Sequence, residues 1–200
     1  MSKSSQWLLL TGLGVLIISP DSLLIRLVNI SDFSLIFYRS YLQAVPLFLF
    51  CLFIYRRNTL SAFLAIGIPG IVYALLFATT HIAFVYSIQH TAVSNTLVII
   101  AGAPIFSAIF SIFFLNEKPS FFTWLIIFIA LASMFIIGWG SYTTSGIFGD
   151  FMAIICAIAM GSGVVLARYF KKIDLVPACF VGCIIAGLFT LPFEIDFNLN

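Results

Sequence analysis

Charged residues are scarce in this sequence. Asp, Glu, Lys and Arg make up only 8% of the chain, whereas 62% of the residues are hydrophobic. A soluble domain carries about 25% charged residues, and the mean hydropathy here is +1.20. So few charges cannot cover a surface that faces water. The composition therefore excludes an ordinary soluble domain and indicates a surface that faces lipid.

The hallmarks of nucleic-acid, phosphate and metal sites are also missing. The formal net charge is only +2, and no basic run is interleaved with aromatic residues as in nucleic-acid-binding proteins. The sequence contains no glycine-rich phosphate loop and no Cys/His spacing typical of a metal site. We therefore expect no nucleic-acid partner, no metal and no cofactor.

Cysteine is rare as well. Cys51, Cys156, Cys179 and Cys183 all lie inside hydrophobic runs. Cys179 and Cys183 are four residues apart and would share one helix face, but a cysteine in such a run usually behaves as a small packing residue. We predict packing roles for all four rather than redox chemistry.

Long hydrophobic runs fill the chain instead. The central pair extends from Ala62 to Ile88 and from Ala92 to Leu115, joined by the short polar segment Gln89-His90-Thr91. Each run exceeds the roughly 20 residues that cross a bilayer, and a backbone in lipid must satisfy its own hydrogen bonds, so each is predicted to be a transmembrane helix. The fold class is therefore all-α, a polytopic integral membrane helical bundle. The expected spans are Trp7–Leu27, Phe33–Tyr55, Ala62–Ile88, Ala92–Leu115, Phe121–Trp139, Ile147–Phe170 and Val176–Phe193.

The basic residues predict an orientation. With these spans, seven of them would share the side of the N-terminus, and Arg26 lies at the other side. Because Lys and Arg accumulate in cytoplasmic loops, we expect a multi-pass protein of the plasma (cytoplasmic) membrane with its N-terminus in the cytoplasm. The seven residues are Lys3, Arg56, Arg57, Lys118, Arg168, Lys171 and Lys172.

Two parts of the chain match at an offset of 142 residues, which places Arg26 on Arg168 and Asp32 on Asp174. The second copy begins five predicted spans after the first, so it would enter the membrane from the opposite face, as in inverted-repeat transporters. We predict a first repeat of five helices, residues 1–140, and an incomplete second repeat of two, residues 147–200. Counterparts of three further helices would occupy roughly residues 204–282. We therefore expect a truncated or partial chain, or a shortened natural variant.

Three ionisable residues lie at one depth inside the predicted spans. Asp21 and Arg39 each lie about 9 Å from the outer end of a helix and His81 about 10 Å, from a rise of about 1.5 Å per residue. An unpaired charge at that depth costs a few kcal/mol, which predicts an Asp21–Arg39 ion pair and a hydrogen bond from His81 to Asp21. The alternatives are a structural clamp between helices, or an Arg39 side chain that reaches outward to the interface.

His81 has two interpretations. An unperturbed histidine has a pKa near about 6.5, so His81 could exchange a proton during transport. It could equally be a satisfied polar residue between helices. Gln43 and Asn95 add donors and acceptors one turn from Arg39 and one turn into the fourth span, whereas His90 is expected to be merely solvated. The expected substrate pathway is Asp21, Arg39, Gln43, His81 and Asn95.

Two prolines inside the spans predict kinks or hinges. Pro20 and Pro104 each remove a backbone donor and leave a carbonyl about four residues earlier without its helical partner. Such a site can bend when helices move against one another.

Four short motifs follow one another at characteristic spacing. They are Phe37-Tyr38-Arg39, the run Ala83-Phe84-Val85-Tyr86-Ser87 leading to Thr91-Ala92-Val93-Ser94, Pro104, and Phe114-Leu115-Asn116-Glu117-Lys118-Pro119. Together they resemble the drug/metabolite transporter superfamily, the EamA-type transporters of ten helices. One departure is Ser19-Pro20-Asp21 in the first span, where the family often has Trp-Gly.

The resemblance implies an inverted-repeat transporter fold lacking its last three helices, with seven of the ten present. It also implies export or uptake of amino acids, metabolites or drugs by alternating access. The expected partners are membrane lipid, a small-molecule substrate, and a second copy or another subunit that supplies the missing helices. Two other functions stay open: an intramembrane enzyme acting on lipid-linked substrates, for which His81 with Asp21 is the candidate pair, and a non-transporting fragment or partner subunit.

Overall fold

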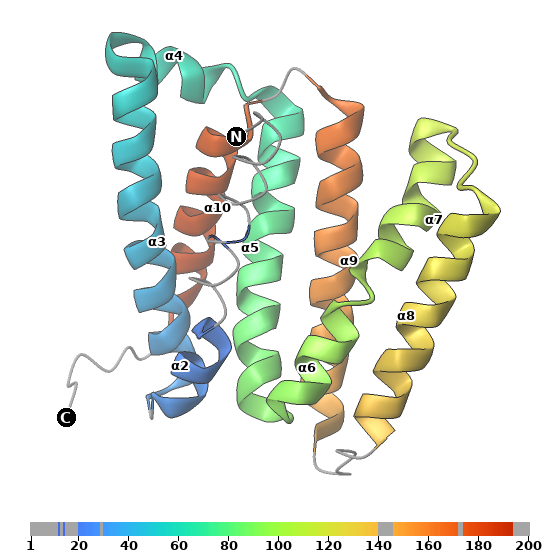
Figure 1. Cartoon of the computed structure of the whole chain (residues 1–200). Coiled ribbons are helices and arrows are strands. Elements are labelled where there is room, and N and C mark those ends of the chain that lie inside the picture. The colour runs from blue at the N-terminus through green and yellow to red at the C-terminus, as the bar shows by residue number, and fades with distance from the viewer. Residues whose placement is uncertain are drawn as a thin grey trace.

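The computed structural model describes residues 20–28, 30–139, 146–171 and 174–193, together with Gly12 and Gly14. All regular structure within these ranges is helical (Figure 1). Most of the predicted first span, Trp7–Leu27, and residues 140–145 lie outside them. The elements are α2 (Asp21–Leu27), α3 (Asp32–Tyr55), the 3₁₀ turn η1 (Arg56–Asn58), α4 (Thr59–Leu64), α5 (Gly67–His90), α6 (Val93–Ile100), α7 (Ala103–Leu115), α8 (Phe121–Trp139), α9 (Ile147–Tyr169) and α10 (Leu175–Thr190).

The helices have the length and composition of membrane spans. Within the described residues, four stretches are long and apolar enough to cross a membrane. The 19-residue α8 and the 16-residue α10 are strongly apolar as well. The predicted all-α polytopic membrane bundle is therefore confirmed. The four stretches are Asp32–Leu64, Gly67–His90, Val93–Leu115 and Ile147–Tyr169.

Several predicted bounds agree with the structure. The helix α8 covers the predicted residues without change, and α3 and α9 differ from the prediction by one residue at one end. α10 is three residues shorter at its end than expected. Its start is set by Asp174, whose carboxylate accepts a hydrogen bond from the Val176 N–H at 3.2 Å, and Ser31 accepts one from Ser34 in the same way before α3. Such N-caps satisfy donors that a helix start leaves unpaired.

The prediction of one helix from Ala62 to Ile88 is wrong at both ends. The chain forms α4, turns at residues 65–66 and begins α5 at Gly67, where φ is +57°. Glycine adopts this left-handed backbone without the steric penalty of a side chain, so the chain can change direction there. At the other end α5 continues to His90, so Gln89 and His90 are helical rather than part of a polar joint.

The predicted span Ala92–Leu115 is interrupted near its middle. α6 ends at Ile100, a turn follows at residues 101–102, and α7 begins with Pro104 in its first two positions. Proline fits the first turn of a helix because the N–H that it lacks would be unpaired there anyway. Pro104 therefore starts a new helix after a break, whereas Pro46 lies inside the continuous α3.

α5 is the central helix of the bundle. α9 and α10 pack along it, α3 packs on α10, and α6 and α7 pack on α9 (Figure 1). Close contacts are made through small residues: a Cβ on Gly161 would lie 2.8 Å from the Ala103 carbonyl oxygen, and one on Gly182 would lie 2.8 Å from that of Ala74. Small residues let membrane helices approach this closely.

The four cysteines are free thiols in the structure. Cys51, Cys156 and Cys183 are buried and Cys179 is half-buried. The Cys156 thiol lies 3.6 Å from the Thr80 carbonyl oxygen and donates to it across the α5–α9 contact. This arrangement agrees with the predicted packing roles.

Polar contacts join the helices at one end of the bundle, which we call the His90 end. Arg26 donates to the carbonyl oxygens of Ile88 and Gln89 at 2.7 and 2.9 Å. His90 lies 2.7 Å from the carboxylate of Asp32, so the expectation that it is merely solvated is wrong. The Thr91 hydroxyl donates to Asp150 at 2.8 Å.

The opposite end, which we call the Arg168 end, holds the basic residues. Arg168 pairs with Glu117 at 2.7 Å, and the Tyr55 hydroxyl donates to Asp174. Arg56, Arg57, Lys118 and Lys171 adjoin these residues in the sequence. The predicted clustering of basic residues on one side therefore holds for the five that the structure describes.

The helices related by the 142-residue offset run in opposite directions. α3 runs from the His90 end to the Arg168 end, whereas α10 starts beside Tyr55 and returns, so that Phe193 stacks on Phe33 with ring centroids 3.9 Å apart. α2 runs toward the His90 end and α9 away from it (Figure 1). Opposite directions are what inverted repeats require; the division into repeats at residues 140 and 147 stays a prediction.

The surroundings of Gly161 and Gly163 predict that an added methyl group changes the stability differently at these two positions. Gly161→Ala should lower the free energy of unfolding by about 1–2 kcal/mol, because the new methyl group meets backbone atoms that cannot move aside. Gly163→Ala is the matched control, since its Cβ would meet only a Tyr73 ring carbon at 3.6 Å, and it should be neutral or stabilise by up to about 1 kcal/mol. Thermal unfolding of both variants in detergent measures the difference. Equal behaviour would contradict this packing.

The two ends of the bundle predict the membrane topology. A reporter fused after Arg57 should be cytoplasmic and one fused after Asp150 external, because the basic end faces the cytoplasm. Arg57 follows α3 at the Arg168 end, and Asp150 contacts Thr91 at the His90 end. Enzymatic reporters with opposite compartment requirements would locate both fusions. The orientation is wrong if both report the same side.

Candidate functional site

The candidate site forms where α2 and α3 meet. α2 starts immediately after Pro20, which serves as its N-cap, so Asp21 is the first helical residue. A carboxylate is favourable at this position because the helix dipole is positive at the N-terminus. Arg39 lies about two turns into α3, on the face turned toward α2.

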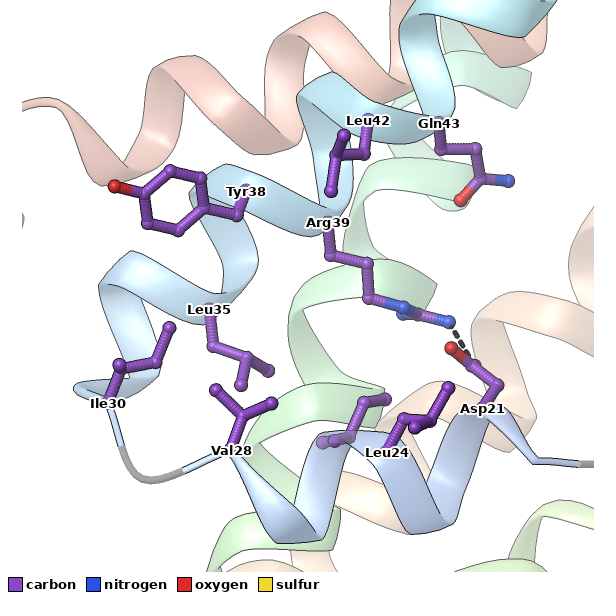
Figure 2. Close-up of a pocket in the computed structure, with 10 residues that line it drawn as sticks. Asp21, Leu24, Val28, Ile30, Leu35, Tyr38, Arg39, Leu42 and Gln43 are labelled. Atoms are coloured by element: carbon purple, nitrogen blue, oxygen red, sulfur yellow. Dashed lines mark hydrogen bonds and ion pairs between the residues drawn. The ribbon is translucent and has the colours of Figure 1, made fainter. Parts of the chain in front are cut away.

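Arg39 and Asp21 form an ion pair. The Nη2 atom of Arg39 donates to Oδ2 of Asp21 at 2.6 Å (Figure 2). The guanidinium carbon lies 5.1 Å from the centroid of the Phe84 ring on α5, a distance at which a cation is attracted to an aromatic face. The side chains remain 24% and 35% exposed, so the pair is accessible from the adjoining pocket. The predicted Asp21–Arg39 ion pair is thus confirmed.

A pocket of about 710 Å³ opens beside this pair. Tyr38 and Gln43 add polar atoms on α3, and Gln43 is placed as the sequence predicted (Figure 2). The rest of the lining is apolar: Leu24, Ile25, Val28, Ile30, Leu35 and Leu42. A few polar groups in an apolar cavity of roughly 300–1,000 Å³ are typical of a small-molecule site.

His81 lies deeper than the pocket. It is buried on α5, 7% exposed, and its ring centroid lies 4.8 Å from that of Phe77 one turn earlier. Its ring is within electrostatic range of Arg39, but it is not among the residues that line the pocket. The predicted hydrogen bond from His81 to Asp21 is absent from the described residues, because the Asp21 carboxylate faces Arg39 instead.

Asn95 is also separate from the pocket. It is buried on α6, 6% exposed, and α6 packs against α9 and α8 and also contacts α5 and α2. Its neighbour Thr96 shares a hydrogen bond of 2.7 Å with Ser87 on α5. Asp21, Arg39 and Gln43 therefore line one pocket, whereas Asn95 is not among the residues that line it.

The two prolines lie at helix starts. Pro20 precedes α2 beside Asp21, whereas Pro104 begins α7 and lines a different pocket. Pro104 therefore follows a break between α6 and α7, and Pro20 directly precedes α2.

Sequence reasoning overlooked most of the pocket wall. Leu35, Tyr38, Arg39, Leu42 and Gln43 follow the spacing of one helix face. That spacing could have extended the prediction from Arg39 to the whole face. The partner face on α2 and the Phe84 ring depend on how helices rotate in the bundle, which helix spacing alone does not specify.

The ion pair predicts a non-additive pair of substitutions. Arg39→Ala should reduce the yield of folded protein because it leaves the Asp21 carboxylate without its partner. The double variant Asp21→Asn with Arg39→Gln should be recovered better than either single substitution, with a coupling energy above about 0.5 kcal/mol. Unfolding in detergent of the wild type, Asp21→Asn, Arg39→Gln and the double variant measures this coupling energy. Simple additivity would show that the two side chains are not coupled.

Comparison with known proteins places this site within a family. Residues 5–139 match the model of the EamA-like transporter family, a stretch that includes Asp21, Arg39 and the pocket between them. No curated protein and no solved structure matches the chain. The family match extends over more than half of the sequence and agrees with the apolar helices of the bundle. The chain therefore belongs to the EamA-like transporter family, whose members are multi-pass membrane transporters of small molecules.

Proposed function

We propose that this protein carries small solutes bearing a carboxylate, with amino acids as the best-fitting class, across the plasma membrane by alternating access. The Arg39 pocket is the substrate site in this proposal. The observation that carries it is an accessible Asp21–Arg39 ion pair in an otherwise apolar pocket of about 710 Å³.

The geometry of Arg39 supports recognition of a carboxylate. Asp21 engages one terminal nitrogen of the guanidinium, and a guanidinium has five N–H donors in a planar fork. The remaining donors can therefore bind a second carboxylate side by side, an arrangement that Arg forms better than Lys.

The presence of Asp21 favours a zwitterion over a simple anion. Asp21 and Arg39 carry opposite charges and lie in contact, so the pocket as a whole gains no net charge from them. An amino acid would place its carboxylate on Arg39 and its ammonium group on Asp21. The apolar wall formed by Leu24, Val28 and Leu42 would accommodate an apolar side chain.

The position of the pocket suits alternating access. It lies between α2 and α3, in the half of the bundle nearer the His90 end. With the N-terminus in the cytoplasm this is the external half. In inverted-repeat transporters one repeat rocks against the other around the binding site. Because α2 and α3 both belong to the predicted first repeat, this proposal also requires α2 to move relative to α3 within that repeat, which would open the ion pair. Pro20, just before α2, is the hinge in this proposal, and the break before Pro104 is a second one.

His81 has a supporting role in this proposal. It is buried within electrostatic range of Arg39 without lining the pocket. A change in its protonation would alter the field at the guanidinium, so coupling of transport to protons would act through His81. The alternative function of an intramembrane enzyme required His81 and Asp21 to act as a pair, and these residues share no hydrogen bond.

Counterflow of labelled amino acids in proteoliposomes tests this proposal. Arg39→Lys should weaken apparent substrate affinity about tenfold or more, because a charge-assisted bond worth about 1.5–3 kcal/mol is lost. Arg57→Lys is the control: it makes the same chemical change at an exposed position outside the pocket. His81→Gln should flatten the dependence of uptake on external pH.

The outcomes separate the two parts of the mechanism. Unchanged uptake in both Arg39→Lys and His81→Gln at every pH would remove the pocket from the transport mechanism. A loss in Arg39→Lys without any pH effect of His81→Gln would retain the substrate site and exclude His81 as the proton carrier.

A further inference from the structure

A second pocket lies at the Arg168 end, away from the Arg39 pocket. It has a volume of about 630 Å³ and is formed by α7, α8 and α9 with the segment that joins α7 to α8. Substrate recognition as proposed above does not use it. Its lining includes Lys118, Arg168, Glu117, Thr123, Ala108 and Ile126.

The entrance of this pocket carries a positive charge that no described carboxylate neutralises. One terminal nitrogen of Arg168 donates to both carboxylate oxygens of Glu117, at 2.7 and 2.9 Å. The other N–H groups of the guanidinium have no hydrogen-bond partner among the described residues. Lys118 is exposed and forms no ion pair with another described residue. Glu117 therefore fixes the position of Arg168, and the three side chains leave one net positive charge.

The charged side chains of the lining lie at the Arg168 end, and small and apolar residues lie further along the helices. Arg168 lies near the end of α9, Lys118 in the segment between α7 and α8, and Thr123 in the first turn of α8. Ala108 and Ile126 lie further along α7 and α8, and Ser107 and Ser111 of α7 also line the pocket. The Thr123 hydroxyl is 3.0 Å from that of Ser120 and remains exposed. A ligand that fits this order has an anionic head, a polar middle and an apolar tail.

We propose that this pocket binds the headgroup of an anionic phospholipid. The phosphate would lie between Lys118 and the free N–H groups of Arg168, the glycerol would lie near Thr123, and an acyl chain would follow Ala108 and Ile126. Basic pockets between helices on the cytoplasmic side of membrane proteins suit such headgroups. A soluble phosphate would satisfy the charges but leave the apolar part of the pocket unused.

The surroundings favour a lipid over a soluble anion. On α8 the side chains of Phe122 and Ile126 are 72% and 66% exposed, and in a membrane span such surfaces contact hydrocarbon. α8 packs on α6. The pocket lies beside α8, and residues of α7 and α9 complete its lining. A bound lipid would bridge these three helices at the Arg168 end and hold α8 against the bundle.

Lipid titration of the purified full-length chain tests this site. Phosphatidylglycerol or phosphatidylcholine is added in detergent, and the apparent Tm and the retained lipid are followed by thermal unfolding and native mass spectrometry. Phosphatidylglycerol should raise the Tm of the wild type, and Lys118→Gln should weaken that response about fivefold, as expected for one cation at an anionic surface. Lys171→Gln is the matched control, since Lys171 is exposed near the same end but does not line the pocket.

Three results would overturn the proposal. Equal weakening in Lys118→Gln and Lys171→Gln would show diffuse attraction to basic residues. An equal response to phosphatidylcholine would show that the lipid charge is not recognised. Stabilisation by inorganic phosphate alone, to the same extent as by phosphatidylglycerol, would assign the pocket to a soluble anion. Since the test involves no transport, it fails or succeeds independently of the amino-acid proposal.

Discussion

Hydrocarbon offers no hydrogen-bond partner, so a chain inside a membrane must pair its own polar atoms. This constraint makes the described elements helical, and it also governs their exceptions. Where α4 gives way to α5 and α6 to α7, the backbone stays bonded: the Ala65 N–H reaches the Ser61 carbonyl at 2.9 Å, and the Gly102 N–H reaches that of Ile99 at 3.0 Å. A break in a span is therefore tolerated when short-range bonds replace the regular ones. Among the described residues, the Ser40 hydroxyl is the one buried polar side-chain group that has no hydrogen-bond partner.

The cost of charge in hydrocarbon also explains where the charged residues lie. Those at the two bundle ends hold helices together where water or headgroups are near, as His90 does with Asp32 and Arg168 with Glu117. The Asp21–Arg39 pair differs because Arg39 lies about two turns inside α3. Charge inside a span is costly, so an accessible pair at this depth indicates binding more strongly than a pair at the surface. Each proposed binding site depends on guanidinium N–H groups that the neighbouring carboxylate leaves available for a ligand.

Sequence reasoning predicted the helices better than their interruptions. Hydropathy located α8 without error because polar residues flank it, but Gly67 and Gly102 are embedded in apolar runs, and hydropathy does not register a change of backbone direction. The depth of each residue in its predicted span was enough to predict the Asp21–Arg39 pair, because opposite charges at one level on adjacent helices are stabilised by pairing. Depth did not predict that His81 lacks a hydrogen bond to Asp21, because depth gives the height of a residue along its helix and not the side from which it projects. The pocket at Lys118 required three helices to be positioned together.

The break between α6 and α7 has a consequence for biosynthesis. An insertion machinery selects segments by their average apolarity, and Val93–Leu115 has a mean hydropathy of 2.4 over its most apolar window, the highest of the four candidate spans. The segment can therefore enter the bilayer as a single stretch regardless of the turn at residues 101–102. The turn acquires its role only later, when Ala103 at the start of α7 comes to lie against Gly161 of α9. Membrane entry thus depends on the average apolarity of the whole stretch, whereas the final shape of this span depends on the residues at the turn.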